Sequence, residues 1–299
     1  MPELPEVETV RLGVDKHVVG AAFTDVSVLH DRAVRRQAGG AAELIGRLRG
    51  QTAVAARRRG KYLWLDLADR AGVSDEALVI HLGMSGQLRI VDSDDANTTT
   101  KHLRIRARLG AREFWFIDQR TFGGWQVDEL VPDPHNRAGR VPSIVAHIAP
   151  DPFDQAFDAD AVALRMAGKR TEIKRALLDQ TLVSGIGNIY ADESLWRARL
   201  RGTRLTDSIS HAKLVELLGH AREVMASALA VGGTSFDELY VNVNGESGYF
   251  ARELSAYGRE GLPCRRCGTT MRRESFMNRS SFYCPQCQRA PRRVSATAR

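Results

Sequence analysis

Residues 264–287 read CRRCGTTMRRESFMNRSSFYCPQC and contain every cysteine of the 299-residue chain. The spacing is C-x2-C-x16-C-x2-C, in which two close pairs can bring four thiolates around one tetrahedral Zn²⁺. Two disulfides are the alternative, and a reducing compartment disfavours them. We therefore expect one zinc ion bound by Cys264, Cys267, Cys284 and Cys287. The zinc is structural, because four protein ligands leave no coordination position open for a substrate.

The segment around this array is strongly basic. The sixteen residues between the cysteine pairs can form two short strands with a tip near Asn278-Arg279-Ser280. Residues 252–299 carry eleven arginines and three glutamates but no lysine or aspartate, a net charge of +8. The whole chain carries +7, so the rest is nearly neutral. Such a module attracts polyanions, nucleic acid first among them; a solvated basic tail is the alternative.

The overall composition is that of an ordinary soluble chain, with 43% hydrophobic and 26% charged residues. It excludes a fully disordered or disulfide-dense protein and suggests two domains of roughly 150 residues each. No stretch approaches the roughly 18 apolar residues that a membrane span needs. The N-terminal sequence MPELPEVETV holds three acidic residues and no basic ones, unlike a signal peptide. We expect a cytoplasmic protein with no membrane partner.

The first half of the chain is rich in strand patterns. A helix is predicted over 5–18, where valines recur at helical spacing after Pro5. Strands are predicted over 61–67, 77–83, 87–91, 102–109 and 112–118. In the fourth of these, His102 and three arginines alternate with apolar residues, which indicates a half-buried antiparallel strand with a cationic solvent face.

The second half is helical. Residues 131–158 hold five of the ten prolines, a density typical of an irregular connection between domains. Helices are predicted over 160–168, 171–180 and 213–229. The pattern thus predicts an α+β, multidomain chain with a β-rich half, a helical half and a small cysteine module.

Gly185-Ile186-Gly187-Asn188 lies between two helical stretches. Glycines at a helix start let backbone N–H groups approach a phosphate, and the helix dipole favours the anion. A plain helix–helix turn is the alternative. Basic residues just upstream favour a clamp on a nucleic-acid backbone; they are Lys169, Arg170, Lys174 and Arg175.

The N-terminus offers an unusual nucleophile. Removal of the initiator methionine exposes Pro2 as a free secondary amine. The reference pKa of an α-amine is about 2.5 units below that of lysine, so far more of it is neutral at pH 7. Its attack on an aldehyde-like carbon gives an iminium directly, and Glu3 or Glu6 can move protons beside it. A frayed acidic terminus is the alternative.

Six motifs, in order along the chain, resemble the bacterial formamidopyrimidine-DNA glycosylase family, whose members excise 8-oxoguanine and ring-opened purines. They are PELPEVET (2–9), RRGKYL (58–63), HLGMSG (81–86), DQRTFG (118–123), SGIGNIYADE (184–193) and NRSSFYCPQC (278–287). The resemblance runs from residue 2 to about 288 and touches every predicted module.

The resemblance implies a fold and a set of boundaries. An N-terminal catalytic β-sandwich with flanking helices would span 2–130 and an interdomain linker 131–158. A helix–two-turn–helix domain with a lesion-covering loop, YVNVNGESGYF (240–250), would span 159–251. A zinc-finger β-hairpin would span 252–288 and a basic tail 289–299. Double-stranded DNA with oxidised bases or abasic sites would lie between the halves of a monomer.

The resemblance also implies catalytic roles. Pro2 would be the nucleophile that displaces the damaged base and forms a Schiff base with the sugar. Glu3 would protonate the ring oxygen or the leaving group, and Glu6 would support the geometry of the nucleophile. Lys61 would contact a phosphate and donate a proton in β-elimination. Arg279 would clamp a phosphate and act in δ-elimination.

Further residues match the family's DNA contacts. Backbone contacts would come from His102, Lys169, Lys174 and Asn188. Met84, Arg120 and Phe122 match the trio that fills the gap left by the extruded base, with Arg120 facing the orphaned partner. Taken singly, Met84 and Phe122 would be assigned to the core and Arg120 to the surface.

Two other functions fit the sequence less well. An endonuclease VIII-like enzyme for oxidised pyrimidines typically starts PEGPE and lacks the trio, and four residues argue against it: Leu4, Met84, Arg120 and Phe122. A non-catalytic zinc-finger protein on the same scaffold is disfavoured by four intact residues: Pro2, Glu3, Lys61 and Arg279. Thr121 is a departure, since the family usually has a second arginine there, and it weakens a backbone contact.

Overall fold

The computed structural model describes residues 2–73, 75–92, 100–232 and 253–290. The chain divides into two compact units. The first comprises residues 1–150 and 227–251, and the second comprises 151–226 and 252–299. Each unit is described by itself.

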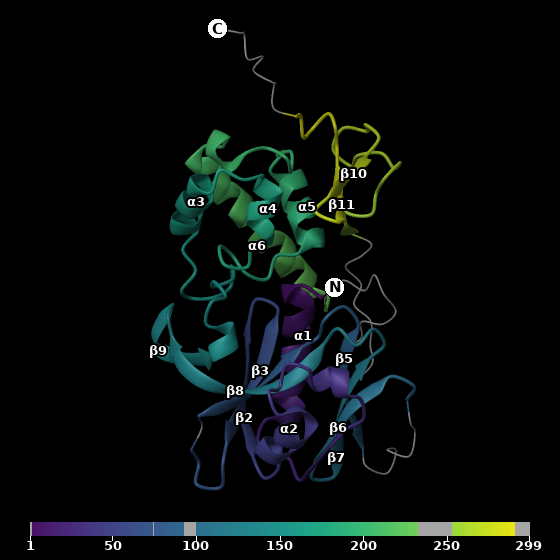
Figure 1. Ribbon diagram of the computed structural model, residues 1–299. Helices are drawn as coiled ribbons and strands as arrows, with labels where there is room; N and C mark the ends of the chain where they lie inside the picture. The colour runs from purple at the N-terminus through teal and green to yellow at the C-terminus, as the bar shows by residue number, and fades with distance from the viewer. Residues whose placement is uncertain (1, 74, 93–99, 233–252, 291–299) are drawn as a thin grey trace. The chain divides into compact units, whose positions relative to one another are not determined.

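Two antiparallel sheets and two α-helices build the first unit (Figure 1). One sheet has four strands, in the order β1 (Asp25–Val28), β6 (Leu103–Leu109), β7 (Arg112–Asp118), β5 (Gly86–Asp92). The other has five, in the order β2 (Thr52–Arg59), β3 (Tyr62–Ala68), β4 (Glu76–His81), β8 (Gly124–Asp133), β9 (Asn136–Pro142). The helical segments are α1 (Leu4–Val18), η1 (Asp31–Val34), α2 (Gly40–Leu48) and η3 (Ser143–Val145).

One hydrophobic core joins the two sheets. Leu63, Leu65 and Leu67 of β3 enter it together with Phe114 and Phe116 of β7. The intervening Trp64 lies in a second cluster on the other face of the five-stranded sheet, as the two-residue period of a strand requires. The predicted β-sandwich is therefore confirmed, and so is the half-buried β6.

Helix α1 packs against this core through valines spaced by three and four residues, Val7, Val10 and Val14. It starts within a residue of the predicted position, because Pro5 suits the first turn and Glu6 completes a capping box with the cap residue Glu3. Helix α2 and strands β1 and β2 were not predicted. These elements are short or begin with small residues, so their local patterns are weak, and packing in the shared core stabilises them.

The second unit contains four helices and a hairpin. The helical segments are α3 (Ala159–Gly168), α4 (Ile173–Leu178), α5 (Asn188–Arg197), η4 (Thr206–Ser208) and α6 (His211–Ala230), and the hairpin strands are β10 (Arg272–Phe276) and β11 (Arg279–Tyr283). The hairpin turns at Met277 and Asn278, whose φ angles of 45° and 58° suit a tight two-residue loop. The predicted hairpin and helices are present. None of the helices in the described ranges is long and apolar enough to cross a membrane.

The proline-rich stretch differs from the prediction. Strands β8 and β9 continue to Pro142, so regular structure extends well into 131–158, and the division between the units falls at residues 150 and 151. Two of the prolines are tolerated because each lies near the end of its strand. Pro132 of β8 is paired with Arg140, and Pro142 of β9 is paired with Leu130.

A buried ion pair ties β8 to β2. The Arg59 guanidinium donates from Nη1 and Nη2 to the two carboxylate oxygens of Asp133 at 2.9 and 2.5 Å, and the side chains are 6% and 4% exposed. Burial alone would raise the pKa of Asp133, but the hydrogen bonds from Arg59 and from the His135 N–H outweigh it and lower that pKa.

We expect Asp133→Asn to lower the free energy of unfolding by about 3 kcal/mol, because it leaves the Arg59 charge buried without its partner. Urea unfolding at pH 7 measures this. Because the pKa of Asp133 is lowered in the folded state, the difference should shrink as the pH falls through the acid range.

The matched control is Asp75→Asn. Asp75 pairs with Arg140 at 2.9 Å, with side chains 68% and 46% exposed. Its loss should cost about 0.5 kcal/mol or less. Equal losses in the two variants would contradict the importance of the buried pair.

Candidate active site and nucleic-acid interface

The N-terminal residues are held in a fixed conformation. Pro2, Glu3 and Glu6 are all buried, and Glu3 is the residue that caps α1. The Glu6 carboxylate accepts a hydrogen bond from the Glu3 N–H at 2.9 Å. Glu6 therefore fixes the peptide that directly follows Pro2, which is a physical basis for its predicted supporting role.

Lys61 lies in the turn between β2 and β3, half-buried, after Gly60, whose φ of 55° allows the turn. The neighbouring Arg58 joins this turn to α1. Its Nε donates to Glu8 at 2.8 Å, and its Nη1 donates to the Gly60 carbonyl at 3.0 Å. The RRGK motif thus couples the position of Lys61 to the helix that follows Pro2.

A buried carboxylate organises the two loops that carry the predicted trio. Asp118 accepts hydrogen bonds from Ser85 Oγ at 2.5 Å, from the Arg120 N–H at 3.1 Å and from the Gly123 N–H at 2.8 Å. Ser85 Oγ in turn accepts from the Arg120 N–H at 3.0 Å. The loop 82–86 is thereby fixed to the loop 118–124.

The trio is exposed, which argues against placing it in the core. Met84 is 36% and Phe122 43% exposed, and Arg120 is exposed beside them. Arg120 Nη1 lies 3.9 Å from Met84 Sδ. The two loops approach so closely that a Cβ on Gly83 would come within 2.4 Å of the Gly123 nitrogen. The HLGMSG and DQRTFG motifs thus meet in space.

His102 belongs to the same end of the unit. Its carbonyl accepts the Asp118 N–H at 2.9 Å, and its Nδ1 lies 3.3 Å from the guanidinium of Arg104. Arg104 donates from Nε to the Asp118 carbonyl at 2.8 Å. The structure therefore brings together four predicted DNA-contact residues around Asp118: Met84, His102, Arg120 and Phe122.

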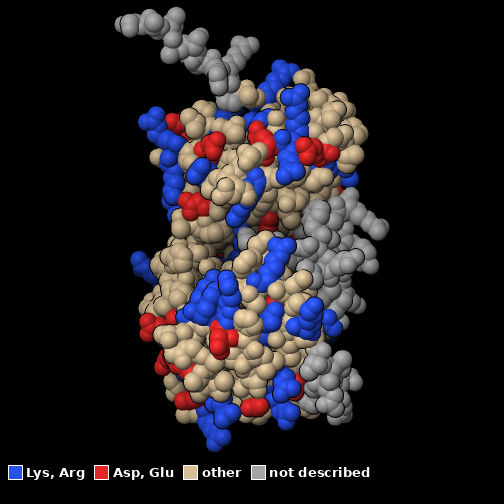
Figure 2. All heavy atoms as spheres, turned by 45° about the vertical axis from the view of Figure 1, so that its right-hand side comes forward, with Lys and Arg blue, Asp and Glu red and all other residues tan. Residues whose placement is uncertain are grey.

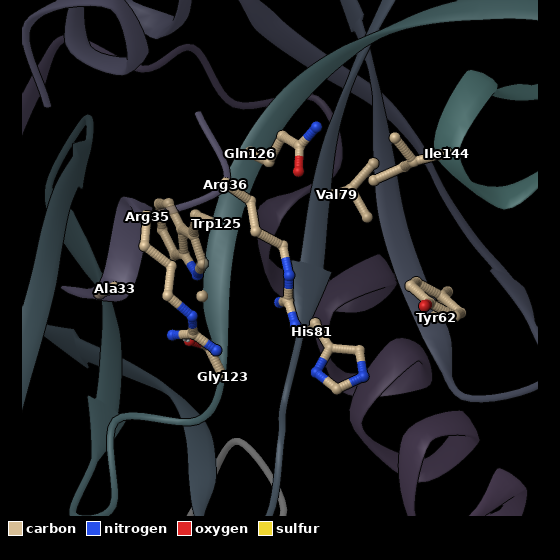
Figure 3. A pocket seen from close by; sticks show the side chains of 11 residues that line it. Ala33, Arg35, Arg36, Tyr62, Val79, His81, Gly123, Trp125, Gln126 and Ile144 are labelled. Carbon is tan, nitrogen blue, oxygen red and sulfur yellow. Dashed lines mark hydrogen bonds between the residues drawn. The ribbon is translucent and has the colours of Figure 1, made fainter. Parts of the chain in front are cut away.

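His81 stands at the base of the Met84 loop, in the wall of a cavity of about 160 Å³ (Figure 3). Burial, with the charges of Arg36 and Arg35, lowers the pKa of His81 to about 4. The ring is therefore neutral at pH 7, and Nδ1 accepts the Gly83 N–H at 3.0 Å. An aromatic contact with Tyr62, with ring centroids 5.3 Å apart, holds the ring from the side.

The four cysteines converge as predicted. Their Sγ atoms all lie within 4.8 Å of one another, and Cys267 Sγ lies 3.5 Å from the Sγ atoms of Cys284 and Cys287. Zinc–thiolate bonds of about 2.3 Å place the sulfurs of a tetrahedral site about 3.8 Å apart, so the group fits Zn²⁺. All four are free thiols rather than disulfides. The Trp196 indole donates to Cys264 Sγ at 3.4 Å, a support from α5.

Asp192 of α5 holds the hairpin in place. This fully buried carboxylate accepts from Ser281 Oγ at 3.1 Å and from the Phe282 N–H at 2.9 Å. It also accepts from Lys174 Nζ at 2.6 Å. Burial raises the pKa of Asp192 to about 6 despite the Lys174 ammonium.

The position of Lys174 corrects the predicted backbone contact. Its side chain is 0% exposed, and besides Asp192 it contacts the Ser280 carbonyl at 3.3 Å. A buried, paired ammonium is not available to a phosphate. The sequence placed Lys174 in a basic cluster, but α4 turns it inward towards α5 and the hairpin, so its role here is structural.

Asn188 is the first residue of α5, and its Nδ2 donates to the Ser280 carbonyl at 2.8 Å. Lys169 follows α3, 46% exposed, and its Nζ pairs with Asp179 at 2.6 Å. Arg279 is exposed at the start of β11 and borders a surface groove of about 640 Å³. The structure thus links Asn188 directly to the hairpin strand that carries Arg279.

The sequence did not predict the buried carboxylates and the hydroxyl that fix these loops. They belong to Asp118, Ser85 and Asp192, which lie within the six motifs beside residues with predicted roles. A polar residue that is buried can be recognised from sequence only if its surroundings are apolar, as the FWFID run before Asp118 shows. The predicted lesion-covering loop, 240–250, and most of the basic tail lie outside the described residues.

Basic side chains form several separate groups on the described surface of both units, and acidic side chains lie between them (Figure 2). On the face shown, basic side chains are thus not confined to the C-terminal segment, in which the sequence concentrates the net charge. Two of the three glutamates of residues 252–299 form ion pairs, Glu274 with Arg201 and Glu260 with Arg273.

Comparisons with known proteins agree with this architecture. Three family models match the chain: the formamidopyrimidine-DNA glycosylase N-terminal domain over residues 1–125, the H2TH domain of that glycosylase over 148–239, and a zinc finger found in FPG and IleRS over 261–290. The fold and the site thus define a multidomain protein with an N-terminal β-domain, an H2TH domain and a four-cysteine zinc finger.

Individual relatives are similar over nearly the full length. A formamidopyrimidine-DNA glycosylase of Mycobacteroides abscessus is 60% identical over 290 residues, covering 97% of this chain and 98% of the relative. A Lactococcus lactis FPG variant in complex with a Fapy-dG-containing DNA is 30% identical with a TM-score of 0.83, covering 97% of this chain and all of that one. A MutM complex with DNA containing carbocyclic 8-oxo-G is 29% identical, with a TM-score of 0.81. The chain belongs to the formamidopyrimidine-DNA glycosylase family.

We expect one zinc per chain, measurable by atomic absorption. Removal with a chelator should unfold the hairpin, because the metal holds both of its ends. Trypsin should then cleave at Arg272, Arg273 and Arg279 at least about tenfold faster. Cleavage within the first unit should not change, and added zinc should restore protection. A hairpin that stays protected after complete metal removal would contradict a structural zinc.

Proposed function

We propose that this protein is a bifunctional DNA glycosylase and AP lyase of base-excision repair. It removes oxidised purines, 8-oxoguanine and formamidopyrimidines, and then cleaves the DNA strand at the abasic sugar. It acts on double-stranded DNA as a monomer, in the cytoplasm where bacterial DNA lies. The family membership supports the activity, and the named relatives bound to Fapy-dG and 8-oxo-G DNA support the substrate class.

The observation within this chain that carries the proposal is the arrangement around Pro2. The nucleophile must be the α-amine itself, so the first peptide has to be held still while the amine reacts. The bond between the Glu6 carboxylate and the Glu3 N–H does this from within α1. Pro2 and Glu3 are both buried, so packing restrains this part of the chain in addition to that hydrogen bond.

The reaction follows from these groups. The Pro2 nitrogen attacks C1′ of the damaged nucleotide, the bond from C1′ to the base breaks, and the base leaves with its electron pair and a proton. Glu3 supplies the proton to the leaving group or to the ring oxygen. The sugar ring then opens at its C1′–O4′ bond: O4′ takes up a proton while the Pro2 nitrogen loses the one it carried as an amine, which gives an iminium between Pro2 and C1′.

The iminium makes the neighbouring protons acidic. Loss of the C2′ proton expels the 3′-phosphate, and loss of the C4′ proton from the conjugated product expels the 5′-phosphate. We assign Lys61 to the first elimination and Arg279 to the second, each also holding a phosphate. Hydrolysis of the imine finally releases the sugar fragment and regenerates the amine.

The exposed trio serves base extrusion. Turning a nucleotide out of the helix costs a few kcal/mol, and inserted side chains recover part of it. Met84 and Phe122 provide apolar surface, and Arg120 provides several donors for the partner base. His102, Lys169 and Asn188 are proposed backbone contacts, and the zinc holds the hairpin that carries Arg279.

The proposal is tested on a duplex with 8-oxoguanine opposite cytosine. The protein should release the base and leave phosphates on both sides of the gap. Glu3→Gln should slow base release by roughly 10²–10⁴-fold, because the amide cannot donate the proton, while it still cleaves a preformed abasic site. The control Glu216→Gln, an exposed residue of α6, should behave as the wild type. Absence of any release by the wild-type protein would refute the function.

Arg120→Ala should relax the choice of the base opposite the lesion. A bidentate contact to a base discriminates by about 1–3 kcal/mol, so the preference for cytosine over adenine should fall roughly tenfold. Single-turnover rates on the two duplexes measure it. Arg112→Ala, an exposed arginine of β7, is the control. An unchanged ratio would remove Arg120 from this role.

A further inference from the structure

Arg35 directly follows η1 and contacts the loop that carries Phe122. Its Nη2 donates to the Phe122 carbonyl at 2.7 Å, and its Nη1 donates to the carbonyls of Thr121 at 3.0 Å and Gly123 at 3.1 Å. Nη1 also lies 2.9 Å from the Arg32 carbonyl of its own turn. Three consecutive carbonyls of one loop therefore face a single guanidinium, whose place beside Gly123 is visible in Figure 3.

This convergence needs a guanidinium. Thr121 adopts a φ of 53°, a region that costs a residue with a side chain about 1–3 kcal/mol. The conformation points neighbouring carbonyls the same way, and they repel one another unless a donor satisfies them. Arginine offers five N–H donors in a rigid plane, whereas lysine offers a compact point charge.

The loop is thus fixed from two sides. Asp118 accepts its N–H groups at Arg120 and Gly123, and Arg35 donates to its carbonyls at 121–123. The side chains of Arg120 and Phe122 remain exposed between these two anchors. Asp118 is buried, but Arg35 is exposed, so Arg35 can be replaced without opening the core.

We propose that Arg35 is a positioning residue for gap filling: it holds the loop 121–123 in the conformation from which Phe122 and Arg120 enter the DNA stack. This inference rests on the proposed function. It makes Arg35 responsible for opposite-base discrimination although it acts only through the backbone of the loop.

The test separates steps that need gap filling from steps that do not. Excision of 8-oxoguanine from a duplex needs it, whereas cleavage of an abasic site in a single strand does not, because no partner base or stack is present. Arg35→Ala should slow duplex excision opposite cytosine by roughly ten- to a hundredfold, as a misplacement of about 1 Å does. It should also lower the cytosine-over-adenine ratio and leave single-strand cleavage unchanged.

Two variants sharpen the result. Arg35→Lys keeps the charge but loses the planar fork, so its excision rate should lie between those of the wild type and the alanine variant. Arg112→Ala removes an exposed guanidinium of β7 that pairs with Asp92, and it should match the wild type in both assays. Thermal unfolding of each variant checks that the fold is retained.

Wild-type rates for Arg35→Ala in both assays, or equal losses in both, would overturn the inference. So would the same loss in Arg112→Ala. A wild-type protein inactive in both assays would refute the proposed function and this inference with it. An active wild type with an unaffected Arg35→Ala refutes the inference alone.

Discussion

The first unit depends on one buried carboxylate. Asp118 is fully buried, and such a charge is tolerated only when hydrogen-bond donors surround it. Its donors come from both loops, and one of them, Ser85, lies 33 residues before Asp118 in the sequence. Satisfying the charge therefore also fixes the two loops to each other. The second unit repeats the principle. Asp192 fixes the hairpin to α5 through Ser281 and Phe282. In both units a rigid buried acid lets neighbouring side chains remain exposed in defined positions, which is what the proposed insertion of the trio into DNA requires.

Catalysis imposes a different constraint, because the proposed nucleophile is the chain terminus. Termini are usually poorly ordered, which would spread the amine over many positions. Here the helix begins two residues later, and its cap uses the carboxylate of Glu6. The same helix binds Arg58 through Glu8, and Arg58 supports the turn of Lys61. A single helix thus positions the amine and also anchors the turn of the lysine assigned to the elimination step.

Much of this could be read from the sequence. The cysteine spacing predicted the zinc site and the hairpin, and the alternation in 102–109 predicted β6, because both signals are local. The motifs predicted that Met84, Arg120 and Phe122 act together, and the structure places all three exposed on two adjacent loops. What failed depends on contacts distant in sequence. Lys174 looked like a surface cation, yet it is buried against Asp192. Strand β9 was not predicted because the prolines in and around it suggested a linker. The anchoring of the loop by Asp118 and Arg35 becomes apparent only when the loops are seen together.

The most direct test of the central claim is to locate the covalent bond. The protein is incubated with a duplex containing 8-oxoguanine opposite cytosine, reduced with borohydride and digested, and the peptide that carries the sugar fragment is sequenced by mass spectrometry. Our account predicts that the fragment is attached to the nitrogen of Pro2, in a peptide from which the initiator methionine has been removed. Attachment to Lys61 or to any other lysine, or an active protein that retains the methionine, would contradict it.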